Sequence, residues 1–373
     1  MKDLLVIAKS LGGGGSEVAL IEFLNHIDYK KYHVTLLLMD HDLEYEYRLK
    51  QKIPIRYIKF YSKIYHRLAS MYSLSGKILK KMKVNEYFKI YDFIAKHADK
   101  EKKHYDLAID FYGYGSFTTA YLALNVSATR KAFWIHDEKM PWIKNVYPYF
   151  DYFSSFCCVS ESIKDNFIQL YPEQKSKAMV FYNVIDTDDI IKKSKEYYPP
   201  EFQKNRLNIV TVGRLTEQKG YDIAIKSAAM LRDKHIDFKW YAIGDGKDKN
   251  KLLKLIAKEH LSDCFILLGR RDNPYPYISN CDIFVLESRH EGYSVALVEA
   301  RILNTLIITS SIPSNKEQIR DCFNGLIAKL TPTDLADTIY KLYKDHNLQC
   351  KLLNNIRSQK INFDNELNKL DNI

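Results

Sequence analysis

Residues 207–220 read LNIVTVGRLTEQKG, an apolar run of strand length that ends at a glycine and continues into a polar loop. Runs of this kind recur along the chain, and amphipathic stretches separate them. In one such stretch Ala224, Ala228 and Leu231 share a helical face. Continuous apolar strands are typical of parallel sheets that helices cover on both faces. The alternation of strand and helix therefore predicts an α/β protein with doubly wound parallel sheets.

The chain has 373 residues, which suits about two domains of this kind. Residues 186–208 are polar and carry a Tyr-Tyr-Pro-Pro segment, so the break between the domains is expected there. We predict an N-terminal domain over 1–186, a linker over 187–206 and a C-terminal domain over 207–350. A C-terminal helix over 351–373 is expected to pack back on the first domain. Ligands of such sheets bind beyond the carboxyl ends of the strands, which places the site in a cleft between the domains.

The composition excludes several classes of protein. Hydrophobic residues make up 46% and charged residues 27%, as in globular proteins. No apolar run approaches the roughly 18 residues of a membrane span. The apolar run at residues 4–8 is too short for a signal peptide, so we expect a cytoplasmic protein. The six cysteines are scattered without a Cys-x-x-Cys pair, which favours reduced thiols over a metal site or disulfides.

Three loops carry residues with the chemistry of an anion site. Residues 12–15 are four glycines before a predicted helix, where backbone N–H groups can approach an anion; the alternative is a flexible turn with Ser16 as the helix cap. Arg214 and Lys219 can clamp a diphosphate or can be two solvated charges. The third loop, residues 291–295, joins Glu291 to the start of another helix. Each loop alone has an ordinary structural explanation, and only their joint occurrence is informative.

Four motifs occur in order in the second half: 212–220 (VGRLTEQKG), 243–246 (IGDG), 265–269 (FILLG) and 291–300 (EGYSVALVEA). The first half has matching stretches at 13–17, 134–137 (WIHD), 158–162 (CVSES) and 182–186 (YNVID). Together they closely resemble the retaining glycosyltransferases of family 4, such as the bacterial capsular and exopolysaccharide enzymes. The resemblance is close from about 205 to 330 and thin between 45 and 125. It implies the GT-B architecture, in which two Rossmann-like domains face a central cleft.

The resemblance also implies roles for individual residues. Arg214 and Lys219 would bind the donor diphosphate and stabilise the departing nucleotide, and Glu291 would bind the transferred sugar. His136 corresponds to the family histidine near the reacting centre, which completes the catalytic set. Glu299 would hold the ribose hydroxyls. The remaining donor-binding residues would be Gly13, Gly14, Gly15, Gly269, Arg270, Arg271, Gly292, Tyr293, Ser294 and Val295.

One departure from the family lies within that set. Many relatives have Phe-Gly after the Glu-Gly pair, whereas this chain has Tyr293 and Ser294. The hydroxyl of Ser294 could add a phosphate contact or change the preference for the sugar.

The function implied is a retaining, metal-independent hexosyltransferase without a cofactor. Its donor would be a nucleoside-diphosphate sugar, UDP being favoured over GDP, and its acceptor a saccharide or a lipid-linked saccharide in surface polysaccharide assembly. The alternatives are a nucleotide-sugar epimerase, another GT-B enzyme and a non-catalytic sugar-nucleotide-binding subunit. The ordered set of Arg214, Lys219, Glu291 and Glu299 favours transfer.

The positive charge is concentrated in one segment. The chain has 56 Lys and Arg against 46 Asp and Glu, a net charge of +10. Residues 56–104 hold 13 of the basic and 4 of the acidic residues, interleaved with tyrosines. One hypothesis is peripheral contact with an anionic membrane at its inner face. The other is a solvated helical surface. We expect no nucleic-acid partner, because no DNA- or RNA-binding module is present.

Overall fold

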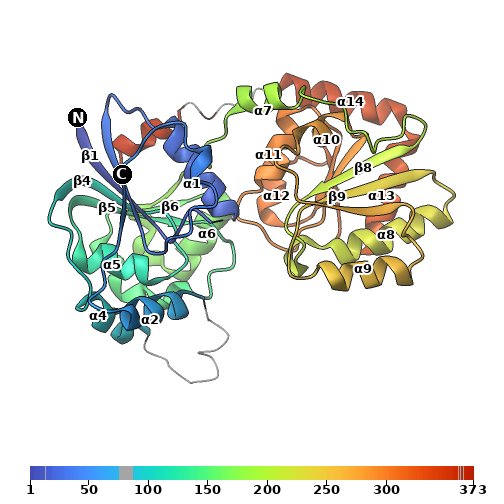
Figure 1. Ribbon diagram of the computed structural model, residues 1–373. Coiled ribbons are helices and arrows are strands. Elements are labelled where there is room, and N and C mark those ends of the chain that lie inside the picture. Colours follow the sequence, from blue (N-terminus) through green and yellow to red (C-terminus); the bar gives the residue numbers. More distant parts are fainter. Residues whose placement is uncertain (13, 75–86, 360, 362, 364) are drawn as a thin grey trace. The chain divides into compact units, whose positions relative to one another are not determined.

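The computed structural model describes residues 1–12, 14–74, 87–359, 361, 363 and 365–373 (Figure 1). The chain folds into two compact units, each described here by itself. Unit 1 comprises Met1–Ile185 with Phe363–Ile373, and unit 2 comprises Asp186–Asn362. Among the described residues each unit is built on one sheet, of seven and six strands. The predicted α/β class with two doubly wound parallel sheets is therefore confirmed.

The sheet of unit 1 has the order β3-β2-β1-β4-β5-β6-β7, and its neighbouring strands are parallel. The strands are β1 (Lys2–Ala8), β2 (Tyr32–Leu38), β3 (Ile55–Tyr57), β4 (His104–Asp110), β5 (Ser127–Ile135), β6 (Ser155–Cys158) and β7 (Ala178–Val180). The chain winds outward in both directions from β1 and β4, which makes the gap between their carboxyl ends the switch point of the sheet.

Helices cover the unit 1 sheet because its central strands are apolar on both faces. Leu4 to Ile7 of β1 are fully buried, and rings from several elements pack around Trp134 of β5. The helices are α1 (Gly15–His26), α2 (Lys63–Leu74), α4 (Tyr87–Ala95), α5 (Phe117–Asn125) and α6 (Glu161–Leu170), with short 3-10 turns η1 (Glu46–Arg48), η2 (Ile143–Asn145), η3 (Tyr147–Tyr152) and η4 (Pro172–Lys177).

The sheet of unit 2 has the order β10-β9-β8-β11-β12-β13 and is also parallel, so its switch point lies between β8 and β11. The face of α8 predicted from Ala224, Ala228 and Leu231 is fully buried against it. The strands are β8 (Leu207–Val212), β9 (Phe238–Ile243), β10 (Phe265–Gly269), β11 (Ile283–Leu286), β12 (Ile307–Ser310) and β13 (Leu326–Ala328). The helices are α7 (Thr187–Lys193), α8 (Tyr221–Asp233), α9 (Lys249–Lys258), α10 (Tyr275–Asn280), α11 (Val295–Ile302), α12 (Pro313–Gln318), α13 (Pro332–Lys344), α14 (His346–Ser358) and the turn η5 (Glu217–Lys219).

Two segments differ from their expected structure. The expected linker over 187–206 begins with helix α7, which Asp186 caps by accepting a hydrogen bond from the N–H of Asp189, and Ile190 is buried in unit 2. The expected single helix over 351–373 is two pieces. Its first part belongs to α14 in unit 2, and Phe363–Ile373, with η6 (Leu367–Asp371), belongs to unit 1.

The C-terminal piece is held in unit 1 by polar contacts. The carboxylate of Asp371 accepts hydrogen bonds from Lys2 at 3.1 Å, from Lys31 and from the hydroxyl of Tyr32 at 3.0 Å. These three donors lower the pKa of Asp371 to about 2, Lys31 contributing most. None of the helices in the described residues is long and apolar enough to cross a membrane.

Candidate functional site

The switch point of unit 2 brings two of the predicted loops together. Strands β8 and β11 are parallel neighbours, with Ile209 paired to Ile283. Both strands therefore end at the same edge of the sheet, and the loops that follow them, residues 213–220 and 287–294, emerge side by side. The order of the strands explains how residues that lie far apart in the sequence come to form one site.

The centre of this site is an ion pair between the two loops. Lys219 Nζ lies 2.5 Å from Glu291 Oε1, and the two side chains are only 13% and 9% exposed. Ser288 donates a hydrogen bond of 2.5 Å to the same oxygen. Because both charges are largely removed from water, each depends on the other for compensation. Glu291 Oε2 has no hydrogen-bond partner in the part of the chain that the structure describes.

Further hydrogen bonds fix the two loops to each other. Arg289 binds both carboxylate oxygens of Asp222 at 2.8 Å, and its N–H donates to the carbonyl of Gln218. Gln218 in turn donates from Nε2 to the carbonyl of His290 at 2.9 Å. A bidentate guanidinium–carboxylate pair fixes orientation as well as distance. Arg289 was not predicted as part of the site, since an arginine in a loop has no distinctive pattern.

Gly220 must be a glycine for two reasons. It caps helix α8 with a φ of 66°, in the left-handed region that residues with a Cβ avoid. A Cβ at this position would also lie 2.1 Å from the carbonyl oxygen of Glu287. The close approach of the two backbones at this point is what allows Lys219 to reach Glu291.

Glu287 is a buried acid that the sequence analysis did not identify. It directly follows β11, is 3% exposed, and neither carboxyl oxygen has a hydrogen-bond partner in the described part of the chain. Burial raises the pKa of Glu287 well above its ordinary value, because the charged form is disfavoured away from water. The signal that could have found it is an acidic residue that continues an apolar run, IFVLE at 283–287.

Helix α11 begins at this same edge of the sheet. Ser294 is its N-cap and is 3% exposed, but its hydroxyl neither caps the helix nor has a partner among the described residues. The N–H groups at the start of the helix and this hydroxyl therefore form one group of donors, to which Gly292, Tyr293 and Val295 contribute backbone. Glu299 lies one turn into the helix, as predicted.

The other predicted donor residues lie on neighbouring loops of unit 2. Arg214 follows β8 and is exposed. Gly269 ends β10 with a φ of 73° and has open space where a Cβ would stand. Arg270 is exposed, whereas Arg271 is held within the unit by contacts of 3.4 Å to Tyr277 and Glu201. The hydrogen bond with Tyr277 is the main cause that raises the pKa of Arg271.

The predicted residues of unit 1 lie at the carboxyl edge of its own sheet. Gly14 is the N-cap of α1 and Gly15 its first residue, with no side chain capping the helix. The alternative in which Ser16 caps the helix is wrong, because Ser16 lies inside α1 and donates to Glu17 at 2.9 Å. Gly13 lies outside the described residues. Because the N-cap is a glycine, it has no side chain that could accept a hydrogen bond from the first N–H groups of α1.

His136 follows β5 and is buried, with 9% of its surface exposed. Its Nε2 lies 2.7 Å from the carbonyl oxygen of Phe111, and because a carbonyl only accepts, Nε2 carries the proton. Burial lowers the pKa of His136 to about 4. The ring is therefore neutral at physiological pH and offers hydrogen bonds rather than charge.

Asp110 is a second buried acid that the sequence analysis missed. It ends β4 and is fully buried, and the hydroxyls of Thr118 and Thr119 donate to it at 3.0 and 2.5 Å. Burial raises its pKa to about 6 in spite of these donors. Asp110 thereby ties the end of β4 to helix α5.

The basic segment 56–104 is only partly open to an anionic surface. Arg56 is paired with Glu101 through two hydrogen bonds of 2.9 and 3.1 Å, and Lys103 is paired with Asp3 at 2.5 Å. Lys77, Lys80, Lys81 and Lys83 lie outside the described residues. In the described ranges, no three His, Cys, Asp or Glu side chains gather closely enough to hold a metal ion.

Comparison with known proteins identifies relatives of this chain. Residues 193–359 match the family described as "Glycosyl transferases group 1". The uncharacterised glycosyltransferase MJ1178 of Methanocaldococcus jannaschii is 32% identical over 195 residues, 52% of this chain and 50% of that protein. The N-acetylgalactosamine-N,N'-diacetylbacillosaminyl-diphospho-undecaprenol 4-alpha-N-acetylgalactosaminyltransferase of Campylobacter jejuni is 26% identical over 202 residues, 54% of this chain and 53% of its own. The chain thus spans about half the length of the curated relatives it matches.

Solved structures share the fold over the whole chain. HepE of Anabaena in complex with UDP-glucose is 18% identical, with a TM-score of 0.76 over 100% of this chain and 99% of that one. TarM of S. aureus, in a complex that contains UDP, is 14% identical, with a TM-score of 0.73 over 100% and 99%. At these identities the likeness establishes the fold alone, which is GT-B.

Proposed function

We propose that this chain, whose residues 193–359 match the family of group 1 glycosyl transferases, transfers a sugar from a nucleoside-diphosphate sugar to a saccharide acceptor in surface polysaccharide biosynthesis. The observation that carries the proposal is the buried pair of Lys219 and Glu291 at the switch point of unit 2. UDP is the favoured nucleotide, in line with the UDP complexes of HepE and TarM. A lipid-linked acceptor is supported by the diphospho-undecaprenol in the names of two Campylobacter jejuni relatives. Peripheral contact with the inner face of the membrane is part of the same proposal.

The ion pair between Lys219 and Glu291 fits the way in which sugar and phosphate are joined in a nucleoside-diphosphate sugar. Lys219 would bind the diphosphate and Glu291 the sugar, and the anomeric carbon is bonded to a phosphate oxygen. The residues that bind the sugar and the phosphate must therefore lie next to each other, and the 2.5 Å contact between Lys219 and Glu291 supports this assignment. Glu291 Oε1 is held by Lys219 and Ser288, which leaves Oε2 to accept a hydrogen bond from a sugar hydroxyl.

Cleavage of the donor separates charge, and the site has a group for each sign. Negative charge develops on the departing diphosphate, where Lys219, Arg214, the N–H groups at the start of α11 and the Ser294 hydroxyl would stabilise it. Positive charge develops at the anomeric carbon, next to the Glu291 carboxylate. These groups are fixed by the fold before the reaction, so little reorganisation is needed when the bond breaks.

Unit 1 would supply the groups for the sugar and the acceptor. The neutral ring of His136 would hydrogen-bond a hydroxyl, and the glycine loop before α1 would let the substrate approach the backbone. Glu299 would hold the ribose, and the backbone near Gly269 would contact the base. We include in the proposal retention of configuration, with departure and attack on one face, and a donor site without a metal ion, where Lys219 and Arg214 provide the positive charge.

Thermal denaturation with UDP, GDP and their sugars tests the proposal, because a ligand that binds only the folded state raises the melting temperature. We expect one diphosphate nucleotide to stabilise the wild type and Lys254→Ala, an exposed control in α9, but to stabilise Lys219→Ala less. No stabilisation by any of them would contradict the proposal. Formation of an epimerised sugar without an acceptor would favour the epimerase alternative.

A further inference from the structure

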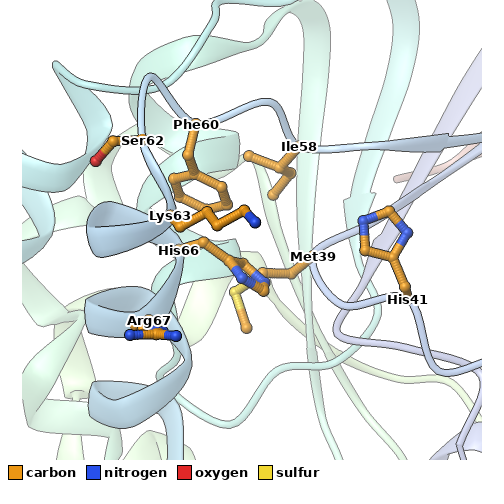
Figure 2. A pocket seen from close by; sticks show the side chains of 8 residues that line it. All are labelled: Met39, His41, Ile58, Phe60, Ser62, Lys63, His66 and Arg67. Carbon is orange, nitrogen blue, oxygen red and sulfur yellow. The ribbon is translucent and has the colours of Figure 1, made fainter.

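A pocket in unit 1 lies outside the residues used so far. It has a volume of about 340 Å³ and is formed by the segments that follow β2 and β3 together with the first two turns of α2 (Figure 2). This volume lies near the lower end of the range for small-molecule sites, roughly 300–1,000 Å³. Because β2 and β3 are parallel to β1, the pocket opens at the same edge of the sheet as the glycine loop.

One wall of the pocket is positively charged. Lys63 and Arg67 stand four residues apart on α2, so they share a face of the helix, and neither has a carboxylate partner in the described part of the chain. Like charges at this spacing destabilise a helix, and the first turn of α2 has no acidic residue. The start of the helix adds its own positive potential on this side.

Asp40 lies near this wall, because it is bonded to His66 of the pocket, but its carboxylate is already engaged. Asp40 accepts hydrogen bonds from His66 Nε2 at 2.8 Å and from the hydroxyl of Ser70 at 3.0 Å. His41 stands on the opposite wall, where its ring lies 3.9 Å from that of Tyr57 (Figure 2). Within the described residues the pocket therefore presents Lys63 and Arg67 as cations without a carboxylate partner, with one histidine between them and one across from them.

The floor of the pocket is apolar. Met39 and Ile58 are 1% and 5% exposed, and the ring of Phe60 lies between those of His66 and Phe117, at 5.4 and 5.5 Å. A ligand that fits such walls has an anionic group for the cations and a flat apolar face for the floor. A sugar phosphate has both, since one face of a sugar ring presents C–H groups and the phosphate accepts charge-assisted hydrogen bonds.

The pocket is also directly connected to the glycine loop. The N–H of Leu11 donates to the carbonyl of Asp42, and the N–H of Met39 donates to that of Ala8, so the segments after β1 and β2 run together. A group bound at Lys63 and Arg67 would thus be held next to the segment that leads into α1.

We propose that this pocket binds the phosphate-bearing end of the acceptor, a glycosyl phosphate or glycosyl diphosphate. The inference rests on the proposed function, because it assigns the acceptor to unit 1. Lys63 and Arg67 bind the phosphoryl oxygens, and Met39, Ile58 and Phe60 support the attached sugar. The same chemistry is offered by a soluble sugar phosphate and by a lipid-linked saccharide.

Calorimetric titration of the full chain with glucose 1-phosphate tests the pocket, with the stabilising nucleotide present in excess to fill the donor site. We expect Lys63→Ala/Arg67→Ala to weaken binding by about tenfold or more. The control Lys96→Ala/Lys102→Ala removes two exposed lysines of the same basic segment and should bind like the wild type. Retained stabilisation by the nucleotide in both double variants shows that they are folded.

A second titration uses glucose linked through a diphosphate to a polyprenyl lipid, in phosphatidylcholine vesicles. Weaker binding of either ligand by Lys63→Ala/Arg67→Ala supports the proposal. The ligand that the wild type binds more tightly shows whether the acceptor is a soluble sugar phosphate or a lipid-linked saccharide. Equal binding by the two double variants, or no binding of either ligand to the wild type, overturns it. If no nucleotide binds, the proposed function fails. The same titrations without nucleotide then still show whether the pocket binds the sugar phosphate.

Discussion

Lys219 Nζ lies 2.5 Å from Glu291 Oε1, although 72 residues separate the two in the sequence. The contact exists because β8 and β11 are neighbours and Gly220 lets the two loops approach. It joins the residue assigned to the diphosphate with the residue assigned to the sugar. Stability and catalysis at this site are therefore expected to depend on the same pair.

The coupling between these two residues can be measured in the free energy of unfolding. Lys219→Met leaves the Glu291 charge buried without its partner and should destabilise the chain by roughly 3 kcal/mol. Glu291→Gln added to it should restore part of that loss, which gives an interaction energy of roughly 1–3 kcal/mol. Urea denaturation of the wild type, both single variants and the double variant checks this. Additive effects would contradict the role of the pair in stability.

The proposed catalytic role of Glu291 can be tested separately from nucleotide binding. Glu291→Gln keeps the shape of the side chain but removes the charge that the proposed function places beside the anomeric carbon, so turnover should fall by roughly 100-fold. Nucleotide affinity should change little, because the phosphates are held by other groups. Transfer of a labelled sugar and calorimetry with the nucleotide measure the two quantities. The exposed Lys254→Ala serves as the control, and near-normal turnover of Glu291→Gln would remove Glu291 from the mechanism.

Gly220 and Gly269 form a matched pair for testing backbone strain. Both have φ in the left-handed region, 66° and 73°, but a Cβ would meet the Glu287 carbonyl at 2.1 Å only at Gly220. Gly269→Ala should therefore lose about 1 kcal/mol from the left-handed conformation alone. Gly220→Ala should lose clearly more, because the loops must also move apart. Equal losses in urea denaturation would show that the close approach contributes nothing.

Glu287 should make stability depend on pH. Burial raises its pKa in the folded state, so the native protein binds the proton more tightly than the unfolded chain does. The stability is then greatest below the unfolded value, near 4.5, and falls as the pH rises through the folded pKa. Glu287→Gln resembles the protonated acid and should melt at a higher temperature than the wild type at pH 7. At pH 4 the two melting temperatures should be similar, and a constant difference would contradict the assignment.

His136 should make stability depend on pH in the direction opposite to that of Glu287. Its pKa is lowered from 6.5 to about 4, so the folded protein binds fewer protons than the unfolded chain between these values. The wild type should lose stability relative to His136→Gln as the pH falls from 6.5 to 4, by up to about 3 kcal/mol. Above pH 6.5 the difference between the two proteins should be constant. Urea denaturation at a series of pH values measures it, and a flat difference would mean that His136 is not held neutral.

Much of the fold could be predicted from local patterns of apolar residues in the sequence. The apolar runs along the chain predict parallel strands because each is buried on both faces, as the full burial of Leu4 to Ile7 illustrates. Strand β3 escaped prediction, since it has only three residues, none of them buried, at the edge of the sheet and so no apolar run. The site loops were found from glycines and charges that directly follow apolar strands, a pattern that a short stretch of sequence contains.

The sequence alone established the α/β class, the repeated strand–helix alternation and the loops that carry Arg214, Lys219 and Glu291, because hydrophobic periodicity is a local property. Folding in three dimensions settled which of these residues meet. The pairing of Lys219 with Glu291, the burial of Glu287 and the pocket around Lys63 and Arg67 all depend on strand order and register. The hydrogen bonds that Lys2 and Tyr32 donate to Asp371 likewise depend on the tertiary structure. Contacts between residues distant in the chain are created by packing, and no local pattern encodes them.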